Sequence, residues 1–111
     1  MHQNYKNKVL KANDIATMST GKRLGHPVRS IKNPYTKEYF KLEYSNISDE
    51  ELEAYGRGSL YRAAVEGDEK TGCFAGQIAG MVNKEQTAKE IIEEIFTQAE
   101  DVLKGATKWV K

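Results

Sequence analysis

The sequence predicts a mainly α-helical fold with at most two short strands and a long C-terminal helix. The clearest sign is an apolar stripe over residues 88–103, whose members recur at steps of three and four residues, the period of one helix face. Residues 33–34 and 48–51 each carry a helix-start signal. A closed barrel of eight strand–helix pairs needs about 250 residues, so this chain of 111 residues cannot hold one.

The first third of the chain predicts one short helix and two extended stretches. Tyr5 and Val9 fall on one side of a helix over residues 4–12. Small and β-branched residues favour an extended stretch over residues 15–20, and alternating apolar and polar residues favour a short strand over residues 28–31. Glycines and a proline between the two stretches interrupt any regular element.

Three short helices are expected in the middle of the chain. Asn33 caps the first, and Ser48 caps the second, which ends at Gly56. Ser59 caps the third, and Gly67 ends it. The side chains expected to face inward on this third helix are Leu60, Ala63 and Ala64.

The last helix is expected to begin with a cap at Asn83 and Gln86 and to end at Gly105. Its apolar stripe is long, so a sizeable surface is needed to cover it. The stripe consists of Ala88, Ile91, Ile92, Ile95, Phe96, Ala99, Val102 and Leu103.

Composition excludes several classes of protein. No run approaches the roughly 20 apolar residues that a membrane-spanning helix needs, and the N-terminus lacks the apolar core of a secretory signal; we therefore expect a cytoplasmic protein. The net charge of +1 lacks the basic surplus of a nucleic-acid binder. The first half is more basic than the second, which leaves open a local phosphate-binding face or a solvated surface.

The single cysteine, Cys73, excludes an internal disulfide and cannot form a zinc cluster alone. No metal site is expected. We interpret Cys73 as a small packed group within a turn.

The first candidate site is the glycine-rich turn and helix start over residues 71–77. Gly76 permits close backbone approach, and Gln77 can both donate and accept hydrogen bonds at the edge of a heterocycle such as a flavin. Phe74 could lie against an apolar substrate. The alternative is a tight helix–helix contact through Gly76 and Gly80.

The second candidate site follows Gly25. His26 precedes a proline and is held in an extended geometry, and with Arg29 and Lys32 it could contact a phosphate of a dinucleotide or of a carrier's prosthetic arm. The alternative is a hydrogen-bonded structural histidine. Residues 56–59 resemble half of a phosphate-binding glycine loop, but no strand precedes them. We interpret them as a break that ends one helix and starts the next.

Several blocks of the sequence resemble, in the same order, motifs of one enzyme family. Residues 2–12 resemble HPNYKEKILKA, residues 25–33 resemble GHAVRAIKN, residues 58–68 resemble GALAKAVVHGD, and residues 74–80 resemble MAGQIAG. These motifs are those of the FMN-dependent enoyl-acyl-carrier-protein reductases of the second type and of the related nitronate monooxygenases. The resemblance covers nearly the whole chain.

The resemblance implies a parent enzyme with an FMN-binding (β/α)8 barrel and a smaller helical domain over the barrel mouth. Residues 1–82 would be that helical lid or substrate domain, residues 83–105 a helix that packs on the missing barrel, and residues 106–111 a tail. Such enzymes pass a hydride from NAD(P)H through FMN to the double bond of an enoyl thioester in fatty acid synthesis, whereas the relatives oxidise alkyl nitronates.

The resemblance also assigns expected roles to single residues. Ala75, Gly76 and Gln77 match the family motif and would face the flavin or substrate, and Phe74 stands in place of a methionine that lines the family's active site. The family's catalytic histidine lies in a GGH block that is not in this sequence, and His26 does not match it. No catalytic residue is therefore expected in this chain, which alone would be inactive and would retain neither FMN nor NAD(P)H.

The partners implied are the missing barrel portion and a carrier-protein thioester or a nitronate; a homodimer is left open, and neither nucleic acid nor membrane is expected. The competing interpretation is a non-catalytic helical binding module from a truncated or split gene. The final helix distinguishes the two. If Ile91, Ile95 and Phe96 are covered by the chain's own helices, a self-sufficient module is favoured, whereas an open apolar face indicates a missing partner surface.

Overall fold

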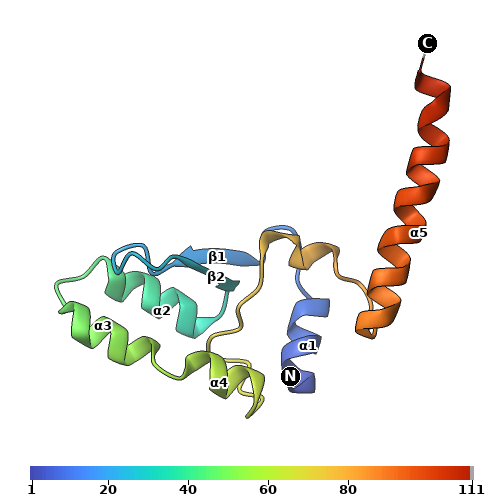
Figure 1. Ribbon diagram of the computed structural model, residues 1–111. Helices are drawn as coiled ribbons and strands as arrows, with labels where there is room; N and C mark the ends of the chain where they lie inside the picture. The colour runs from blue at the N-terminus through green and yellow to red at the C-terminus, as the bar shows by residue number, and fades with distance from the viewer. Residues whose placement is uncertain (111) are drawn as a thin grey trace.

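The computed structural model describes residues 1–110, which form the mainly helical fold with one two-stranded sheet and a long C-terminal helix that the sequence predicts (Figure 1). Lys111, the last residue of the predicted tail, lies outside the described residues. The elements in chain order are α1 (Gln3–Leu10), β1 (Thr17–Thr20), β2 (Val28–Ile31), α2 (Pro34–Glu43), α3 (Asp49–Gly56), α4 (Ser59–Ala64), the 3-10 helix η1 (Gln77–Met81), α5 (Ala88–Ala106) and the 3-10 helix η2 (Thr107–Trp109).

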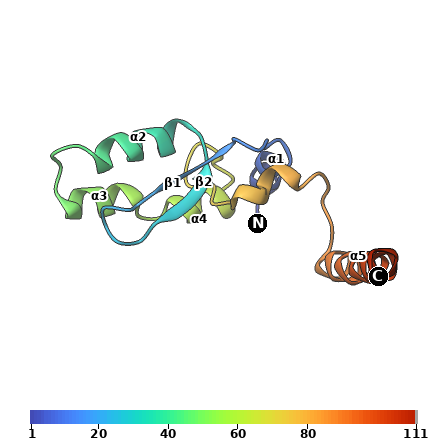
Figure 2. The same ribbon diagram turned by 90° about the horizontal axis from the view of Figure 1, so that it is seen from above.

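The molecule has an elongated shape because α5 stands apart from the other elements (Figures 1 and 2). Its principal extents are 60 × 34 × 19 Å, and its radius of gyration is 18.2 Å. A compact domain of this length would have a radius of gyration of about 13 Å. Apart from the adjoining η2, α5 has no substantial contact with another helix or strand of the described chain.

The predicted helix starts at α2 and α3 are confirmed. Asn33 accepts a hydrogen bond from the backbone N–H of Thr36 at 2.9 Å, and the Thr36 hydroxyl accepts one from the Asn33 N–H at 2.8 Å. Ser48 and Glu51 form the same reciprocal arrangement at the start of α3. These capping pairs define the starts of both helices, because each pair accepts hydrogen bonds from two backbone N–H groups that have no partner within the helix.

The start predicted for the last helix is wrong. Thr87 caps α5, and its side chain accepts from the Glu90 N–H while the Glu90 carboxylate accepts from the Thr87 N–H. A threonine with a glutamate three residues later is the stronger capping pair, and it outcompetes the predicted cap at Asn83 and Gln86. The helix also passes through Gly105 and ends at Ala106.

Two details of α4 also differ from the prediction. Gly58, with φ +71°, is the N-cap, and Ser59 is the first helical residue. Ala63 is fully buried, but Leu60, which we expected to face inward, is 43% exposed. The reason is that the core beside α4 is small. Ala63 packs in it with Tyr5 and Cys73, but the core does not extend to Leu60. The buried thiol of Cys73 confirms its interpretation as a packed group.

The two strands form an antiparallel hairpin in which Thr17 pairs with Ile31 and Thr20 with Val28. Gly21 and Gly25 adopt left-handed backbone conformations in the connecting loop, with φ +78° and +74°. A Cβ on Gly21 would lie 2.6 Å from the carbonyl oxygen of His26, so the loop closes only with glycine at this position.

Candidate functional site

The segment that contains Phe74 lies along the edge of the hairpin. The N–H of Ile31 donates to the carbonyl of Cys73 at 2.8 Å, and the N–H of Ala75 donates to the carbonyl of Arg29 at 3.1 Å. Ser30 and Phe74 form an antiparallel bridge between these two hydrogen bonds. The segment therefore pairs with β2 as a short third strand would, and this pairing fixes the backbone of the segment.

The preceding turn is held by Asn33. Its amide nitrogen donates to the carbonyl of Thr71 at 2.7 Å and to that of Glu69 at 3.2 Å, while its oxygen caps α2. The Thr71 hydroxyl in turn donates to the carbonyl of Ser59 at 3.1 Å. The sequence indicated Asn33 only as a cap, because nothing in its local pattern shows that the other end of the amide reaches residues far along the chain.

Tyr5 holds the same segment from the side of α1. Its hydroxyl donates to the carbonyl of Phe74 at 2.5 Å. Burial raises the pKa of Tyr5 above its usual value, and the proximity of Cys73 raises it further. Tyr5 therefore stays protonated and continues to donate at physiological pH.

Gly76 and Gln77 are exposed at the point where this segment leaves the hairpin and η1 begins. A Cβ on Gly76 would meet no atom of the described residues within 4 Å. A Cβ on Gly80 would lie 2.6 Å from the Asn13 backbone. The alternative of a helix–helix contact through both glycines is therefore wrong: Gly80 packs on a turn, and Gly76 faces open space.

His26 is positioned by the loop that joins β1 and β2. Both carboxylate oxygens of the buried Glu43 accept backbone hydrogen bonds in this loop, from Gly21 at 3.1 Å and from Arg23 at 2.9 Å. The Arg23 guanidinium also forms an ion pair with Asp49 at 2.8 Å. Nothing in the sequence indicated the role of Glu43, since a glutamate near a helix end is ordinarily solvated.

The second candidate site does not form one cluster. Arg29 donates to the Thr17 hydroxyl at 3.2 Å on the neighbouring strand. Lys32 donates to the carbonyl of Ile15 at 2.7 Å. His26 and Lys32 lie at opposite ends of β2, and a strand rises about 3.3 Å per residue, which separates them by about 20 Å. Their predicted contact with phosphate stays a prediction.

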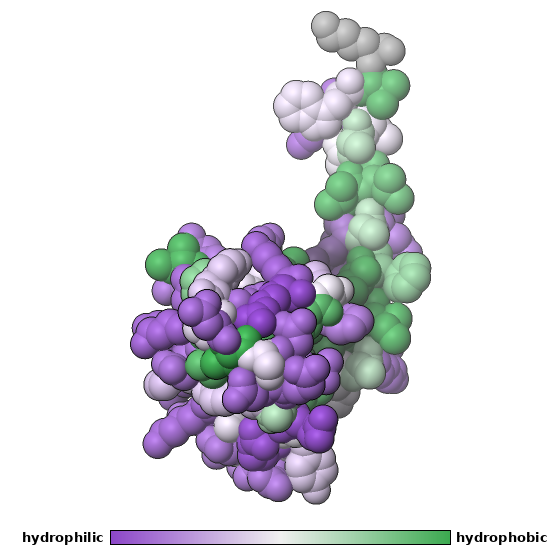
Figure 3. Space-filling model, turned by 90° about the vertical axis from the view of Figure 1, so that its left-hand side faces the viewer, coloured by the Kyte–Doolittle hydropathy of each residue, from purple (hydrophilic) through white to green (hydrophobic). Residues whose placement is uncertain are grey.

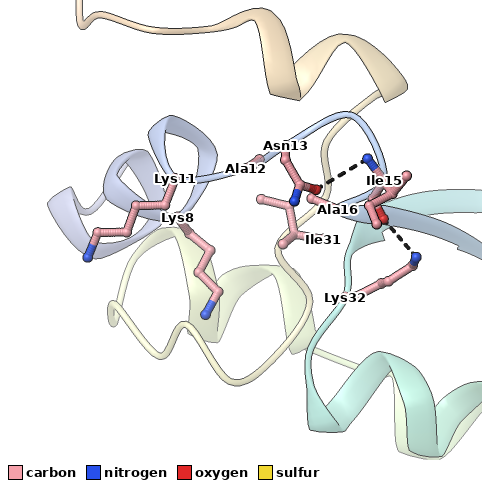
Figure 4. Close-up of a pocket in the computed structure, with 8 residues that line it drawn as sticks. All are labelled: Lys8, Lys11, Ala12, Asn13, Ile15, Ala16, Ile31 and Lys32. Carbon is pink, nitrogen blue, oxygen red and sulfur yellow. Dashed lines mark hydrogen bonds between the residues drawn. The ribbon is translucent and has the colours of Figure 1, made fainter.

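Lys32 lines a cavity of about 420 Å³ together with Lys8 and Lys11 (Figure 4). The three ammonium groups point in different directions, and that of Lys32 is turned toward the carbonyl of Ile15 (Figure 4). Three lysines that diverge do not form a phosphate cradle. The cavity therefore gives no support to a phosphate site at Lys32.

A smaller cavity, of about 180 Å³, brings together two of the predicted residues, Phe74 and His26. It lies between the hairpin, α2 and the start of α4. The structure thus joins one residue from each predicted site, a relationship that their separation in sequence did not indicate.

The apolar face of α5 is open, which is the outcome expected if the chain lacks a partner surface. Hydrophobic residues run along the projecting helix, whereas the surface of the remainder is largely hydrophilic in this view (Figure 3). Ile91 is 44% exposed and Phe96 68% exposed. The other large apolar residues of this face that are exposed are Ile92, Ile95, Val102 and Leu103.

Comparison with known proteins supports the resemblance found in the sequence. No protein-family model matches the chain, and no curated protein matches it significantly. Among solved structures, FabK from Thermotoga maritima matches 98% of this chain with 34% identity and a TM-score of 0.89. A point mutant of the same FabK matches 98% with 30% identity and a TM-score of 0.75.

The chain has the fold of a FabK segment. FabK is the FMN-dependent enoyl-acyl-carrier-protein reductase of the second type, so the family resemblance is confirmed. The chain spans about a third of the FabK chains that it matches, 35% of one and 31% of the other. No helix within residues 1–110 is both long and apolar enough to cross a membrane.

Proposed function

We propose that this chain is the lid portion of an FMN-dependent oxidoreductase that reduces enoyl thioesters with NAD(P)H. The observation that carries the proposal is the match of 98% of the chain to FabK at 34% identity and a TM-score of 0.89. The matched third of FabK contains the helices and hairpin of this chain, and the remaining two thirds would supply the FMN-binding barrel.

The barrel portion is proposed to bind the open face of α5. Burial of one large aliphatic or aromatic side chain contributes about 1.5–3 kcal/mol, so the six exposed residues of this face represent on the order of 10 kcal/mol of gross transfer free energy. A face of this kind is usually an interaction site. The apolar residues Ile78, Met81 and Val82 continue the surface from α5 to η1 and line a groove of about 440 Å³ with Ile91 and Ile95.

Residues 74–77 are proposed to contact the flavin edge and the substrate. The exposed amide of Gln77 can donate to or accept from a flavin ring. Gly76 leaves room for a ring to approach the backbone, and Phe74 offers an apolar wall. These features fit an edge contact with FMN. FMN supplies hydride transfer when bound; the role of these residues is to orient it and to exclude water from it.

A chimera tests the proposal. The matched third of Thermotoga maritima FabK is replaced by this chain, and the purified chimera is assayed for bound FMN and for NAD(P)H oxidation with a crotonyl thioester. We expect a yellow, active chimera, whereas the chain alone retains no FMN. A folded chimera that binds FMN but oxidises only nitronates would assign the second activity of the family instead. Retention of FMN and turnover by the chain alone would contradict the proposal.

A further inference from the structure

We propose that the cavity of about 180 Å³ beside Phe74 is a binding site for a small uncharged ring with a hydrogen-bonding edge, of the size of phenol. We call it the hairpin cavity. The residues on which the proposal depends are Thr20, Ser30, Ser59, Tyr35, Tyr39 and Phe74. The inference requires neither FMN nor a barrel, although Phe74 belongs both to this cavity and to the segment that is proposed to contact the substrate.

Three buried hydroxyl groups line the hairpin cavity. Ser30 is 1% exposed, Ser59 4% and Thr20 5%. Within residues 1–110, no side-chain hydrogen bond joins any of these three hydroxyls to another residue. Every fully enclosed side-chain oxygen in this part of the chain has a hydrogen-bond partner, so the oxygens of these three hydroxyls are not fully enclosed. All three residues line the cavity, so their hydroxyls are available to a molecule bound in it. Buried polar groups without a protein partner require one from a ligand or from water.

Three aromatic residues also line the cavity, Tyr35, Tyr39 and Phe74. Tyr35 stacks on Tyr55 with ring centroids 5.1 Å apart and an interplanar angle of 5°, and Tyr39 lies tilted against Tyr35 at 6.3 Å. Phe74 is fixed by its backbone pairing with Ser30. A planar ring fits against these side chains because offset-stacked and edge-to-face aromatic pairs are favourable.

The charges around the cavity favour a neutral ligand. No carboxylate, lysine or arginine is among the residues that line the cavity, and the imidazole of His26 lies at an exposed position. The neighbouring carboxylate, Glu43, already accepts from the N–H groups of Gly21 and Arg23. Burial, and then Glu43, raise the pKa of Tyr39, which keeps its hydroxyl protonated. A charged ligand would lose hydration without gaining a partner.

The volume sets the size of the ligand. An engineered apolar cavity of about 150 Å³ holds benzene. The hairpin cavity is slightly larger, at about 180 Å³, and its hydroxyls add room for one polar substituent. A phenol-sized molecule therefore fits in it.

Two of the three hydroxyls, those of Ser30 and Ser59, differ from the family motifs that the chain resembles. Ser30 and Ser59 each stand where those motifs have alanine, and Phe74 stands where they have methionine. All three changes line the same cavity.

The test is a titration of the full isotope-labelled chain with phenol, with benzene as the probe without a hydroxyl, and with benzoate as the charged probe, followed by amide NMR shifts. We expect saturable shifts at residues 20, 30, 59 and 74 with phenol and no saturable binding of benzoate. Ser30→Ala with Ser59→Ala should weaken phenol binding about tenfold and leave benzene binding unchanged.

Ser19→Ala is the matched control, because successive side chains of a strand point to opposite faces, so Ser19 points away from Thr20. It should leave phenol binding unaltered. Circular dichroism spectra that coincide with that of the unmodified chain establish that each variant is folded. The proposal would be overturned if phenol produced no saturable shifts, if the shifts lay elsewhere, or if Ser19→Ala weakened phenol binding equally. None of these outcomes would bear on the FabK-like function.

Discussion

The Tyr5 hydroxyl donates a hydrogen bond to the carbonyl of Phe74 at 2.5 Å, across 69 positions of sequence. This contact joins α1 to the segment that we propose to lie at the flavin edge. Phe74 is also paired with Ser30 of the hairpin. The segment is therefore held from two sides, and its geometry depends on α1 as well as on the sheet.

Tyr5→Phe removes this hydrogen bond and keeps the buried ring. The carbonyl of Phe74 loses its side-chain partner, so the free energy of unfolding should fall by about 1 kcal/mol. Urea unfolding followed by circular dichroism measures the change. Tyr61→Phe, at a side chain that is 59% exposed, serves as the matched control and should alter stability by no more than about 0.5 kcal/mol. An equal effect of both substitutions would show that the Tyr5 hydrogen bond contributes nothing.

Stability should also fall at alkaline pH. The pKa of Tyr5 is raised above its ordinary value of 10.0, mainly by burial and then by Cys73. Folding therefore favours the protonated Tyr5 side chain. The contribution of this side chain to the free energy of unfolding is complete below pH 10 and is lost as the pH rises through the folded-state pKa. Tyr39 and Tyr55 are shifted in the same direction. Urea midpoints measured between pH 8 and about 11.5 should decline at the alkaline end, less steeply for Tyr5→Phe than for the unmodified chain. Parallel curves for the two proteins would rule out the linkage at Tyr5.

Glu43→Ala should destabilise the loop that carries His26. The substitution leaves the buried N–H of Gly21 without its acceptor and also removes the acceptor of Arg23. Loss of a charged acceptor for buried donors costs about 1–3 kcal/mol. Amide hydrogen exchange should become faster over residues 21–26. Glu53→Ala, at an exposed position of α3, is the control; if it accelerates exchange in that loop equally, Glu43 does not hold it.

The elements that the sequence predicts well are those governed by nearest neighbours. The reciprocal caps at Asn33 and Ser48 involve residues three positions apart, and the strand over residues 28–31 alternates visibly. The predicted start of α5 was wrong because Thr87 and Glu90, four positions after Asn83 and Gln86, form the reciprocal cap instead. Local pattern can thus indicate an element and still misplace its first turn.

The candidate site was predictable in part. The glycine-rich segment was visible in the sequence, and the structure adds its pairing with β2, which depends on a contact between residues more than 40 positions apart. The role of Glu43 and the hairpin cavity were not predictable, because both arise where the loop, α2 and α4 meet in space. Lys32 illustrates the reverse: its charge suggested a phosphate, but a nearby carbonyl holds its ammonium group.

The accessibility of engineered thiols tests the central claim, that the open apolar face of α5 binds the barrel portion. Ile95→Cys lies on the open face, Glu100→Cys lies at another exposed position of α5, and Cys73 is buried. Maleimide labelling of both variants should be fast in the isolated chain. In the FabK chimera, labelling at position 95 should be strongly slowed and labelling at position 100 should stay fast. Fast labelling at position 95 in a folded, FMN-containing chimera would contradict the account.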